Sequence, residues 1–386
     1  MRWLYPDELD HEEAASRRAV ISRIEQWWQA FEERRHDIAA LFTGEQDWDL
    51  AAFMREHLER IDERLSWEFG PALAGDGDRL VITPEGDLRL RPLVDQIIRR
   101  APRLEGWEYY HSRLAEPLEV AVSTTEEVTE HAMGRVHVSA SVRAMNRIDL
   151  DFWMPDAADK EFARAQAVIA TGHLLGEEAL SRWIGNVEVQ LQREGDAWMP
   201  LDALPGTVFS EVAGIDSVLP AKPLYELVAE LKWSLWRLTP PEREDYARHE
   251  DLLMGSSALD EMSHCAQLGV PFDSRRYSKV GETFAYVKFD GDGRKMAARM
   301  EERKVLEASL NTALVKAGVG CVVGTGTGRR YSYLDLALSD VAKALPLIRE
   351  VGRKTGLAKR SWVQFHDEHL GDEWAGIHED TPPPPR

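Results

Sequence analysis

The richest concentration of acid, base and nucleophile side chains in this chain lies between residues 248 and 265. The candidates for proton transfer are His249, Glu250, Asp251 and His264. Together they could serve an acid-base or hydrolytic enzyme. The segment lacks the strand, Gly-x-Ser-x-Gly turn and helix of a hydrolase nucleophile. A helix start capped by Ser256 or Ser257 explains the same residues more simply.

A second group of candidate side chains, suited to metal binding, stands near the C-terminus. The histidines are His366, His369 and His378, with acidic residues between them. Structural zinc sites take four defined ligands and favour cysteine and histidine. Residues 368–386 are instead acidic and proline-rich, and we expect this tail to be extended and mobile. We therefore expect no native metal site and no cofactor.

A run of alternating glycine and threonine, residues 324–328, follows Val322 and Val323, which are typical of a strand end. A phosphate-binding loop also leaves a strand through glycines, but it must open into a helix whose N-terminal amides face the anion. Residues 331–338 instead alternate in polarity, which indicates a strand. We therefore expect the glycines to form a hairpin turn, where positive φ values favour glycine.

Residues 282–367 predict a complete small domain in the order strand, helix, strand, strand, helix, strand. The first helix, expected over residues 295–317, carries apolar residues three or four apart and ends at Gly318. The second begins after Ser339 or Asp340, either of which can cap it. The two helices would cover one face of a four-stranded antiparallel sheet, which is a ferredoxin-like arrangement.

Strand alternation assigns the side chains of this sheet to two faces. In the third strand Leu334, Leu336 and Leu338 would pack under the helices, and the residues between them point the other way. The residues expected on the uncovered face are Tyr286, Tyr331, Tyr333, Asp335, Trp362 and His366. Such an aromatic and polar patch is rarely left to water, so it should bind another part of this chain, another subunit or a ligand.

The length of 386 residues exceeds what one hydrophobic core usually serves, so we expect several domains. We place N-terminal helices and an α+β domain at 1–195, a helical connector at 196–280, the ferredoxin-like domain at 281–367 and the tail at 368–386. Residues 65–191 repeat the element order of the C-terminal domain with insertions. We infer a second ferredoxin-like unit and an α+β fold class with antiparallel sheets backed by helices.

The N-terminal region begins with amphipathic helices expected at residues 11–42 and 47–64. No window approaches the roughly 20 consecutive apolar residues that span a bilayer, and the first residues lack the apolar core of a signal peptide. The two cysteines, Cys265 and Cys321, are far apart in the sequence, which favours reduced thiols. These features predict a cytoplasmic protein with no membrane partner.

The net charge of -20 is unevenly distributed. Residues 282–366 hold 15 Lys and Arg against 9 Asp and Glu, whereas the residues before and after them are acidic. Attraction between these parts favours docking of the basic domain on the rest of the chain, or a homodimer through its sheet. The basic patch leaves RNA open as a partner of this domain alone. The global acidity opposes RNA and makes DNA an unexpected partner.

Several short motifs resemble those of a bacterial family of unknown function. They are Trp27-Trp28, 80–86, 101–107, Leu175-Gly176-Glu177 and 324–335. The C-terminal domain is also similar in topology to the regulator of ribonuclease E activity B, a ferredoxin-like protein that inhibits a ribonuclease by binding it. That resemblance matches no functional residue here and implies a binding role by analogy alone.

Three classes of function follow from these patterns. A protein-binding or regulatory module without catalytic activity is the first expectation, because an open aromatic sheet face and charge asymmetry are typical of binding surfaces. An acid-base or hydrolytic enzyme with a site near residues 248–265 is the second. The third is RNA binding on the C-terminal sheet, where Tyr286, Tyr331, Tyr333 and Trp362 could stack on bases.

Overall fold

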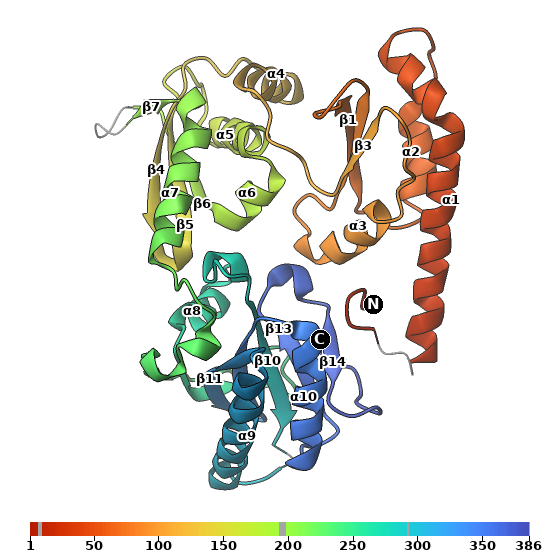
Figure 1. Cartoon of the computed structure of the whole chain (residues 1–386). Helices are drawn as coiled ribbons and strands as arrows, with labels where there is room; N and C mark the ends of the chain where they lie inside the picture. Colours follow the sequence, from red (N-terminus) through yellow and green to blue (C-terminus); the bar gives the residue numbers. More distant parts are fainter. Residues whose placement is uncertain (7–9, 193–197, 292, 386) are drawn as a thin grey trace. The chain divides into compact units, whose positions relative to one another are not determined.

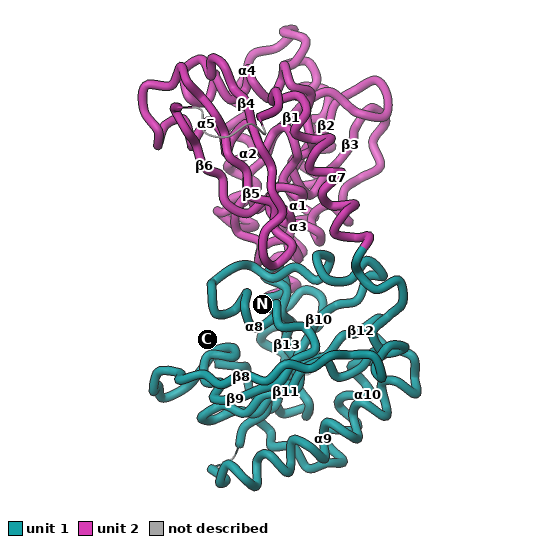
Figure 2. Tube along the Cα trace, turned by 90° about the vertical axis from the view of Figure 1, so that its left-hand side faces the viewer, with its two compact units in different colours: residues 1–14, 218–386 teal, residues 15–217 magenta. Residues whose placement is uncertain are grey.

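The computed structural model describes residues 1–6, 10–192, 198–291 and 293–385, and it has an α+β fold (Figure 1). The chain divides into two compact units (Figure 2). Unit 1 contains Met1–Ala14 and Val218–Arg386, and unit 2 contains Ala15–Ser217. This division differs from the boundaries expected at residues 195 and 280, because the residues from 218 to 280 group with the C-terminal domain.

Unit 1 contains the ferredoxin-like arrangement expected from the sequence. Its elements are β10 (Thr283–Asp290), α9 (Met296–Ala317), β11 (Gly320–Gly328), β12 (Tyr331–Leu338), α10 (Val341–Lys354) and β13 (Ser361–Phe365). The strands lie in the order β13-β10-β12-β11 and pair antiparallel. Gly318 ends α9 in the left-handed conformation, and the Asp340 carboxylate caps α10 by accepting from the Lys343 amide. Both helix boundaries therefore follow local signals.

Three further strands extend this sheet to seven. The strand β14 (Trp374–Gly376) pairs with β13 at one edge, and β9 (Leu252–Ser257) and β8 (Ser234–Arg237) continue from β11 at the other. The helix α8 (Asp260–Leu268) follows β9. The described part of the tail is therefore not wholly irregular, because β14 lies within it, whereas residues 381–385 have no regular secondary structure. The backbone of β14 completes the sheet, and Trp362 donates from Nε1 to the Pro382 carbonyl at 2.6 Å.

The main core of unit 1 lies between the sheet and the helices α9 and α10. Leu334, Leu336 and Leu338 of β12 are buried there with Leu306, Leu310 and Leu314 of α9. Side chains alternate along a strand, so this burial sends the intervening residues of β12 to the opposite face.

That opposite face is covered by the chain itself. Its residues Tyr286, Tyr331, Tyr333 and Trp362 form a second buried cluster with Tyr246 and Leu252. The prediction of an uncovered aromatic surface was therefore wrong. Of the three occupants expected for this face, namely another part of this chain, another subunit or a ligand, the structure shows the first. The covering residues include the segment before β9, which periodicity left as an irregular connector.

The glycine run does not form the expected hairpin turn. Gly324, Gly326 and Gly328 lie within β11, and the reversal falls at Arg329 and Arg330 instead. Each glycine leaves space for a neighbouring side chain. An added Cβ would lie 2.3 Å from Asp335 at Gly324, 2.6 Å from Leu252 at Gly326 and 2.3 Å from Asp251 at Gly328. Close approach, and not a positive φ value, therefore explains this run.

The N-terminal residues of unit 1 are attached to its C-terminal edge. The Glu373 carboxylate accepts from the backbone amides of Trp3, Leu4 and Tyr5 at 2.6, 3.0 and 3.0 Å. The Arg2 guanidinium lies 3.7 Å from the Trp374 ring centre. The Tyr5 ring stacks on Phe365 with ring centres 5.0 Å apart. Buried polar and aromatic contacts thus hold the first residues on β13 and β14.

Unit 2 contains most of the N-terminal elements. Its helices are α1 (His11–Phe42), α2 (Leu50–Leu58), α3 (Arg91–Ile98), α4 (Leu118–Thr129), α5 (Lys160–Leu175), α6 (Glu177–Trp183) and α7 (Leu204–Val218), of which α1 begins and α7 ends in unit 1. Its strands are β1 (Ser66–Pro71), β2 (Asp78–Thr83), β3 (Trp107–Tyr110), β4 (His137–Arg143), β5 (Arg147–Trp153), β6 (Ile184–Gln190) and β7 (Met199–Pro200). The long helix expected at residues 11–42 is confirmed.

The strands of unit 2 do not form a second ferredoxin-like sheet. They make one sheet in the order β1-β2-β3 and another in the order β6-β5-β4-β7. The pairs β2–β3 and β5–β6 are parallel, so the expectation of purely antiparallel sheets was also wrong. The sequence reveals the order of strands along the chain, but their pairing depends on long-range contacts that periodicity does not encode.

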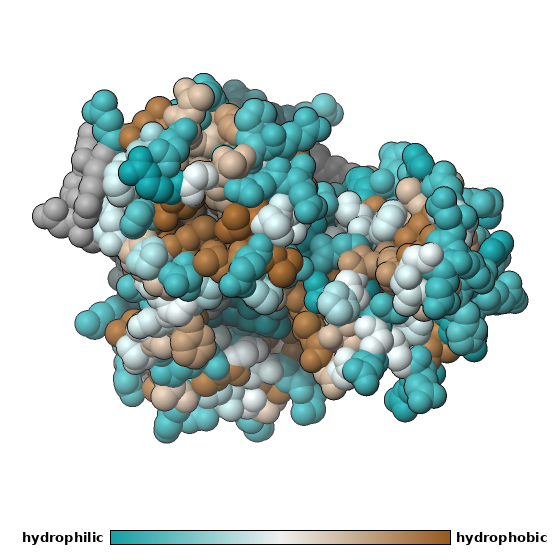
Figure 3. Space-filling view, turned by 90° about the horizontal axis from the view of Figure 1, so that it is seen from above, coloured by the Kyte–Doolittle hydropathy of each residue, from teal (hydrophilic) through white to brown (hydrophobic). Residues whose placement is uncertain are grey.

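The surface seen in Figure 3 is predominantly hydrophilic, with apolar patches between polar side chains, as expected for a chain that is 30% charged. Among the described residues, no helix combines the length and apolar character needed to cross a bilayer. Both cysteines are buried thiols that form no disulfide.

The substitution Gly328→Ala tests the account of the glycine run. The new methyl group would meet the Asp251 carboxylate, which is fully buried and held by the Arg330 and Tyr331 amides at 2.8 Å each. We expect a loss of about 1–3 kcal/mol in the free energy of unfolding of unit 1, measured by calorimetry. Gly214→Ala is the control, because α7 leaves this position open. Equal stability of Gly328→Ala and the wild-type protein would contradict the account.

Candidate functional site

Two histidines and one carboxylate meet on the covered face of the sheet in unit 1. Asp335 is on β12, His366 directly follows β13, and His249 lies in the segment before β9. The Nε2 atoms of His249 and His366 lie 3.2 and 3.1 Å from the same oxygen, Oδ1 of Asp335. The three side chains are between 8% and 13% exposed. The cluster is therefore nearly buried while retaining slight access to solvent.

Strand geometry explains why Asp335 points into this cluster. The residues on either side of it, Leu334 and Leu336, are in the core beneath the helices, so Asp335 faces the other way. It pairs with Tyr286 of β10 and with Gly324 of β11. Because Gly324 has no side chain, the carboxylate can lie against the backbone of β11, where a Cβ would be 2.3 Å from Oδ2.

The electrostatics of the cluster favour an ionised carboxylate beside a neutral imidazole. Burial alone would raise the pKa of Asp335, but the hydrogen bonds from His249 and His366 outweigh burial and lower it. Burial lowers the pKa of His249, and the nearby His366 and Lys288 lower it further, against the opposite influence of Asp335. A metal ion requires ligands in these protonation states.

Aromatic rings surround the cluster and restrict the orientation of the imidazoles. The ring of His249 lies 4.0 Å from that of Tyr286, 4.6 Å from that of Tyr333 and 5.1 Å from that of His366, between ring centres. The two imidazoles are nearly parallel, with an angle of 17° between them. Packing of this kind holds the imidazole rings in place before any ion or substrate binds to them.

The spacing of these ligand atoms suits a transition metal ion. Ligand atoms about 2.1 Å from an ion are about 3.0 Å apart at a right angle and about 3.4 Å apart at the tetrahedral angle. The two observed distances of 3.2 and 3.1 Å fall within that range. One ligand atom from each of the three residues can be chosen so that all lie within 4.8 Å of one another. Two histidines and a carboxylate are a ligand set used for zinc and for non-haem iron.

Asp251 has a structural position next to the cluster. Its carboxylate accepts from the amides of Arg330 and Tyr331 and from the Tyr333 hydroxyl, which lies 2.5 Å away. The carboxylate therefore fixes the β11–β12 reversal and the Tyr333 ring that stacks on His249.

Lys288 places a buried ammonium group on the same face of the sheet. Its Nζ donates to the carbonyls of Tyr246 and Ala247 and lies 4.1 Å from the Tyr331 ring centre. Burial lowers the pKa of Lys288 from 10.5 to about 8, although Asp251 and Asp245 act in the opposite direction. Lys288 and Asp335 thus place groups of opposite charge in the same buried layer on this face of the sheet.

The other candidates from the sequence lie elsewhere. Glu250 is exposed and pairs with Arg243, and His264 is exposed on α8. His378 donates from Nε2 to the Leu357 carbonyl at 2.8 Å and does not join His366. His369 is outside the cluster as well.

The sequence supplied all three members of the cluster but in separate hypotheses. His249 was a catalytic candidate, Asp335 a surface residue, and His366 both a surface residue and a metal candidate. Alternation places Asp335 and His366 on one face. No local pattern indicates that His249 returns to that face from an irregular segment.

Comparisons with protein-family models, with curated proteins and with solved structures found no match to this chain. The function must therefore be inferred from the site alone.

Lys288→Met tests whether a charge is buried on this face. Because the pKa of Lys288 is lowered, the unfolded state binds more protons between pH 8 and 10.5, and wild-type stability relative to Lys288→Met should rise through that window. The expected rise is roughly 3 kcal/mol, measured by denaturant titration at several pH values. The exposed Lys304 provides the control substitution, Lys304→Met. A pH-independent difference for Lys288→Met would contradict the burial of its charge.

Proposed function

We propose that unit 1 is a metal-dependent enzyme of the hydrolytic class, with His249, Asp335 and His366 as the ligands of one divalent transition metal ion. The observation that carries this proposal is the convergence of two imidazole Nε2 atoms on one buried carboxylate oxygen, at 3.2 and 3.1 Å. These separations are also hydrogen-bond distances, so the support for a metal site lies in the meeting of three ligand side chains from three separate segments of the chain.

The number of ligands supports a catalytic centre over a structural one. Structural zinc ions are enclosed by four protein ligands, whereas catalytic ions keep three and leave a position for water or substrate. A divalent ion held by His249, Asp335 and His366 would supply a bound water of lowered pKa as the nucleophile. The side chains of His249 and Asp335 are 12% and 13% exposed, so the cluster is not sealed from solvent.

The first expectation, a protein-binding or regulatory module, has lost its main support. It relied on an exposed aromatic sheet face, but Tyr286, Tyr331, Tyr333 and Trp362 are each 1% exposed or less. Bases cannot stack on rings that the chain itself covers, so the same burial removes the support for RNA binding. The acid-base interpretation of His249, in contrast, is supported by the Asp335 carboxylate and the His366 imidazole, which lie next to it.

Metal analysis of His249→Ala, Asp335→Asn and His366→Ala tests the ligand set. The wild-type protein should bind one equivalent of zinc or cobalt, and each substitution should weaken binding by more than about a hundredfold, because even removal of a residue that only supports a ligand costs 10–100-fold. Equilibrium dialysis with elemental analysis measures the loss. The visible absorption of bound cobalt reports the ligand geometry.

His264→Ala is the matched control, since it removes an exposed histidine from the same unit. It should bind metal as the wild-type protein does, and circular dichroism should show that all four variants are folded. Metal binding that is equal in His264→Ala and His366→Ala would refute the site.

The hydrolytic class has a separate test. Metal-loaded protein should cleave chromogenic carboxylic or phosphoric esters, with activity lost in His366→Ala and retained in His264→Ala. A general acid-base centre without metal would keep its activity after complete removal of metal by a chelator. Such an outcome would replace the metal proposal with the earlier acid-base interpretation.

A further inference from the structure

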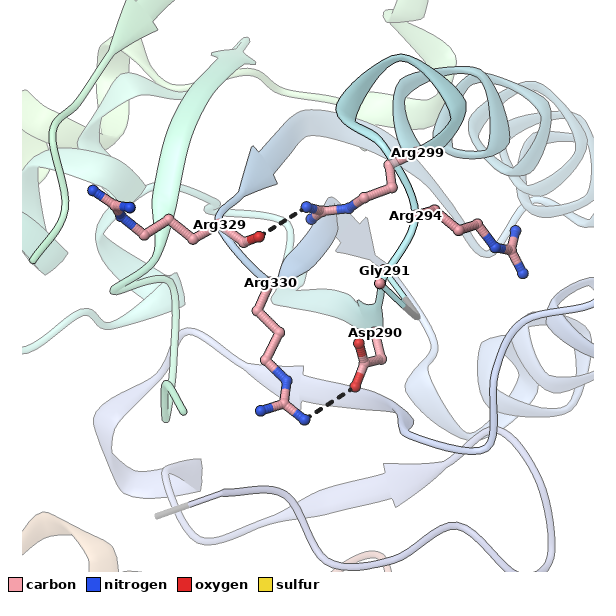
Figure 4. A pocket seen from close by; sticks show the side chains of 7 residues that line it. Asp290, Gly291, Arg294, Arg299, Arg329 and Arg330 are labelled. Atoms are coloured by element: carbon pink, nitrogen blue, oxygen red, sulfur yellow. Dashed lines mark hydrogen bonds and ion pairs between the residues drawn. The ribbon is translucent and has the colours of Figure 1, made fainter. Parts of the chain in front are cut away.

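A second site candidate lies at the start of β12. A partly open pocket of about 490 Å³ is formed by the end of β10, the start of α9 and the β11–β12 reversal. Its described lining includes Asp290 and the arginines Arg294, Arg299, Arg329 and Arg330. Figure 4 shows Arg299 in the middle, with Arg294 and Arg329 extending to opposite sides. The described lining thus contains four arginines and one acidic residue.

Arg299 is the fixed element of this pocket. It is only 4% exposed, and its two terminal nitrogens donate to the carbonyls of Arg329 at 3.0 Å and Tyr331 at 2.6 Å. Within the described part of the chain, its Nε has no hydrogen-bond partner, and no carboxylate forms an ion pair with its guanidinium. Asp251 and Asp290 influence Arg299 electrostatically but form no ion pair with it. A buried cation without an ion pair is costly, so an anion in the pocket would stabilise it.

Gly291 lets the Arg299 side chain pack directly against the backbone. An added Cβ at Gly291 would lie 2.3 Å from the Arg299 Nε. The unpartnered Nε therefore points to backbone that carries no side chain, beside the lining of the pocket. Arg299 also lies in the first turn of α9, which begins at Met296, and the partial positive charge of a helix N-terminus adds to that of the arginines.

The other three arginines form ion pairs of different exposure. Arg329 lies 3.7 Å from Glu242, whose side chain is 88% exposed. An exposed pair of this kind contributes little stability, so Arg329 can turn toward a ligand at small cost. Arg330 lies 3.4 Å from Asp290 and Arg294 lies 2.9 Å from Glu302. These two carboxylates are 13% and 14% exposed, so Arg330 and Arg294 would keep their pairs when a ligand binds.

The one carboxylate of the described lining does not cancel the charge of the arginines. Asp290 is paired with Arg330 and also with Arg360, whose Nε lies 3.2 Å from Oδ2. Its charge is thus already compensated, and Arg294, Arg299 and Arg329 are the remaining charged residues of the described lining.

We propose that this pocket binds the phosphate group of a small organic phosphate ester. Guanidinium groups match phosphate oxygens with paired hydrogen bonds, and a doubly charged phosphate gains more than a carboxylate from several arginines. The volume of about 490 Å³ exceeds that of a bare phosphate ion and falls within the range of small-molecule sites, so the organic part also has space. The site is independent of the proposed metal centre.

Calorimetric titration of the full chain with adenosine 5′-monophosphate, glucose 6-phosphate and inorganic phosphate, at low and constant ionic strength, tests this proposal. At least one ester should bind in a one-to-one complex and more tightly than inorganic phosphate. Arg294→Gln and Arg329→Gln should each weaken its binding about tenfold, because each loses a charge-assisted contact. Both positions are exposed, so these variants should fold even if Arg299→Gln does not.

The control is Arg353→Gln, which removes an exposed arginine of α10 in the same unit. It should bind the ester as the wild-type protein does, and unmodified adenosine should not bind. The proposal is overturned if none of the three phosphates binds, if inorganic phosphate binds as tightly as both esters, or if Arg353→Gln weakens binding as much as Arg329→Gln.

Discussion

Burial of charge on the second face of the large sheet is the constraint on which unit 1 depends. Asp335, Asp251 and Lys288 all lie in this layer, where an unpaired charge would cost several kcal/mol. One short segment, residues 246–251, takes part in all three pairings. The carbonyls of Tyr246 and Ala247 accept from Lys288, and His249 forms a hydrogen bond with Asp335. Asp251 accepts from a backbone amide of the β11–β12 reversal. The segment has little regular structure of its own. Its position follows from these pairings.

The glycines of β11 make this layer possible. Without side chains at residues 324, 326 and 328, there is space for the carboxylates of Asp335 and Asp251 and for the Leu252 side chain. Rings of tyrosine and tryptophan fill the remaining volume and donate hydrogen bonds at the edges, as Tyr333 does to Asp251. The strand β12 connects both proposed sites, since Asp335 lies in its middle and the Tyr331 carbonyl that holds Arg299 lies at its first residue.

The ferredoxin-like order of elements could be predicted because its signals are local. Alternation defined the strands, and Gly318 and Asp340 ended and began the helices. The same alternation placed Asp335 and His366 on one face. The contribution of His249 could not be predicted, because its segment has no period and its position depends on contacts with residues about 40 to 120 positions away.

The wrong prediction for residues 324–328 and the missing prediction for Arg299 have the same physical cause as the missing prediction for His249. Glycine is favoured both in turns and where backbone must approach another group closely. Residues 324–328 are therefore compatible with a turn or with close packing, and only the positions of Asp335 and Asp251 in the fold distinguish the two. Arg299 was counted as one residue of an amphipathic helix. Its burial depends on the reversal at Arg329 and on the glycine at residue 291, neither of which a helical pattern reveals.

The attachment of residues 2–5 to the β13–β14 edge means that unit 1 is assembled from two distant pieces of chain. During synthesis the ribosome delivers residues 15–217 as one continuous stretch, which can acquire its contacts early. Residues 2–5 must wait for Glu373 and Trp374 to be translated. Until then their buried partners are missing, and this segment is available to chaperones and proteases.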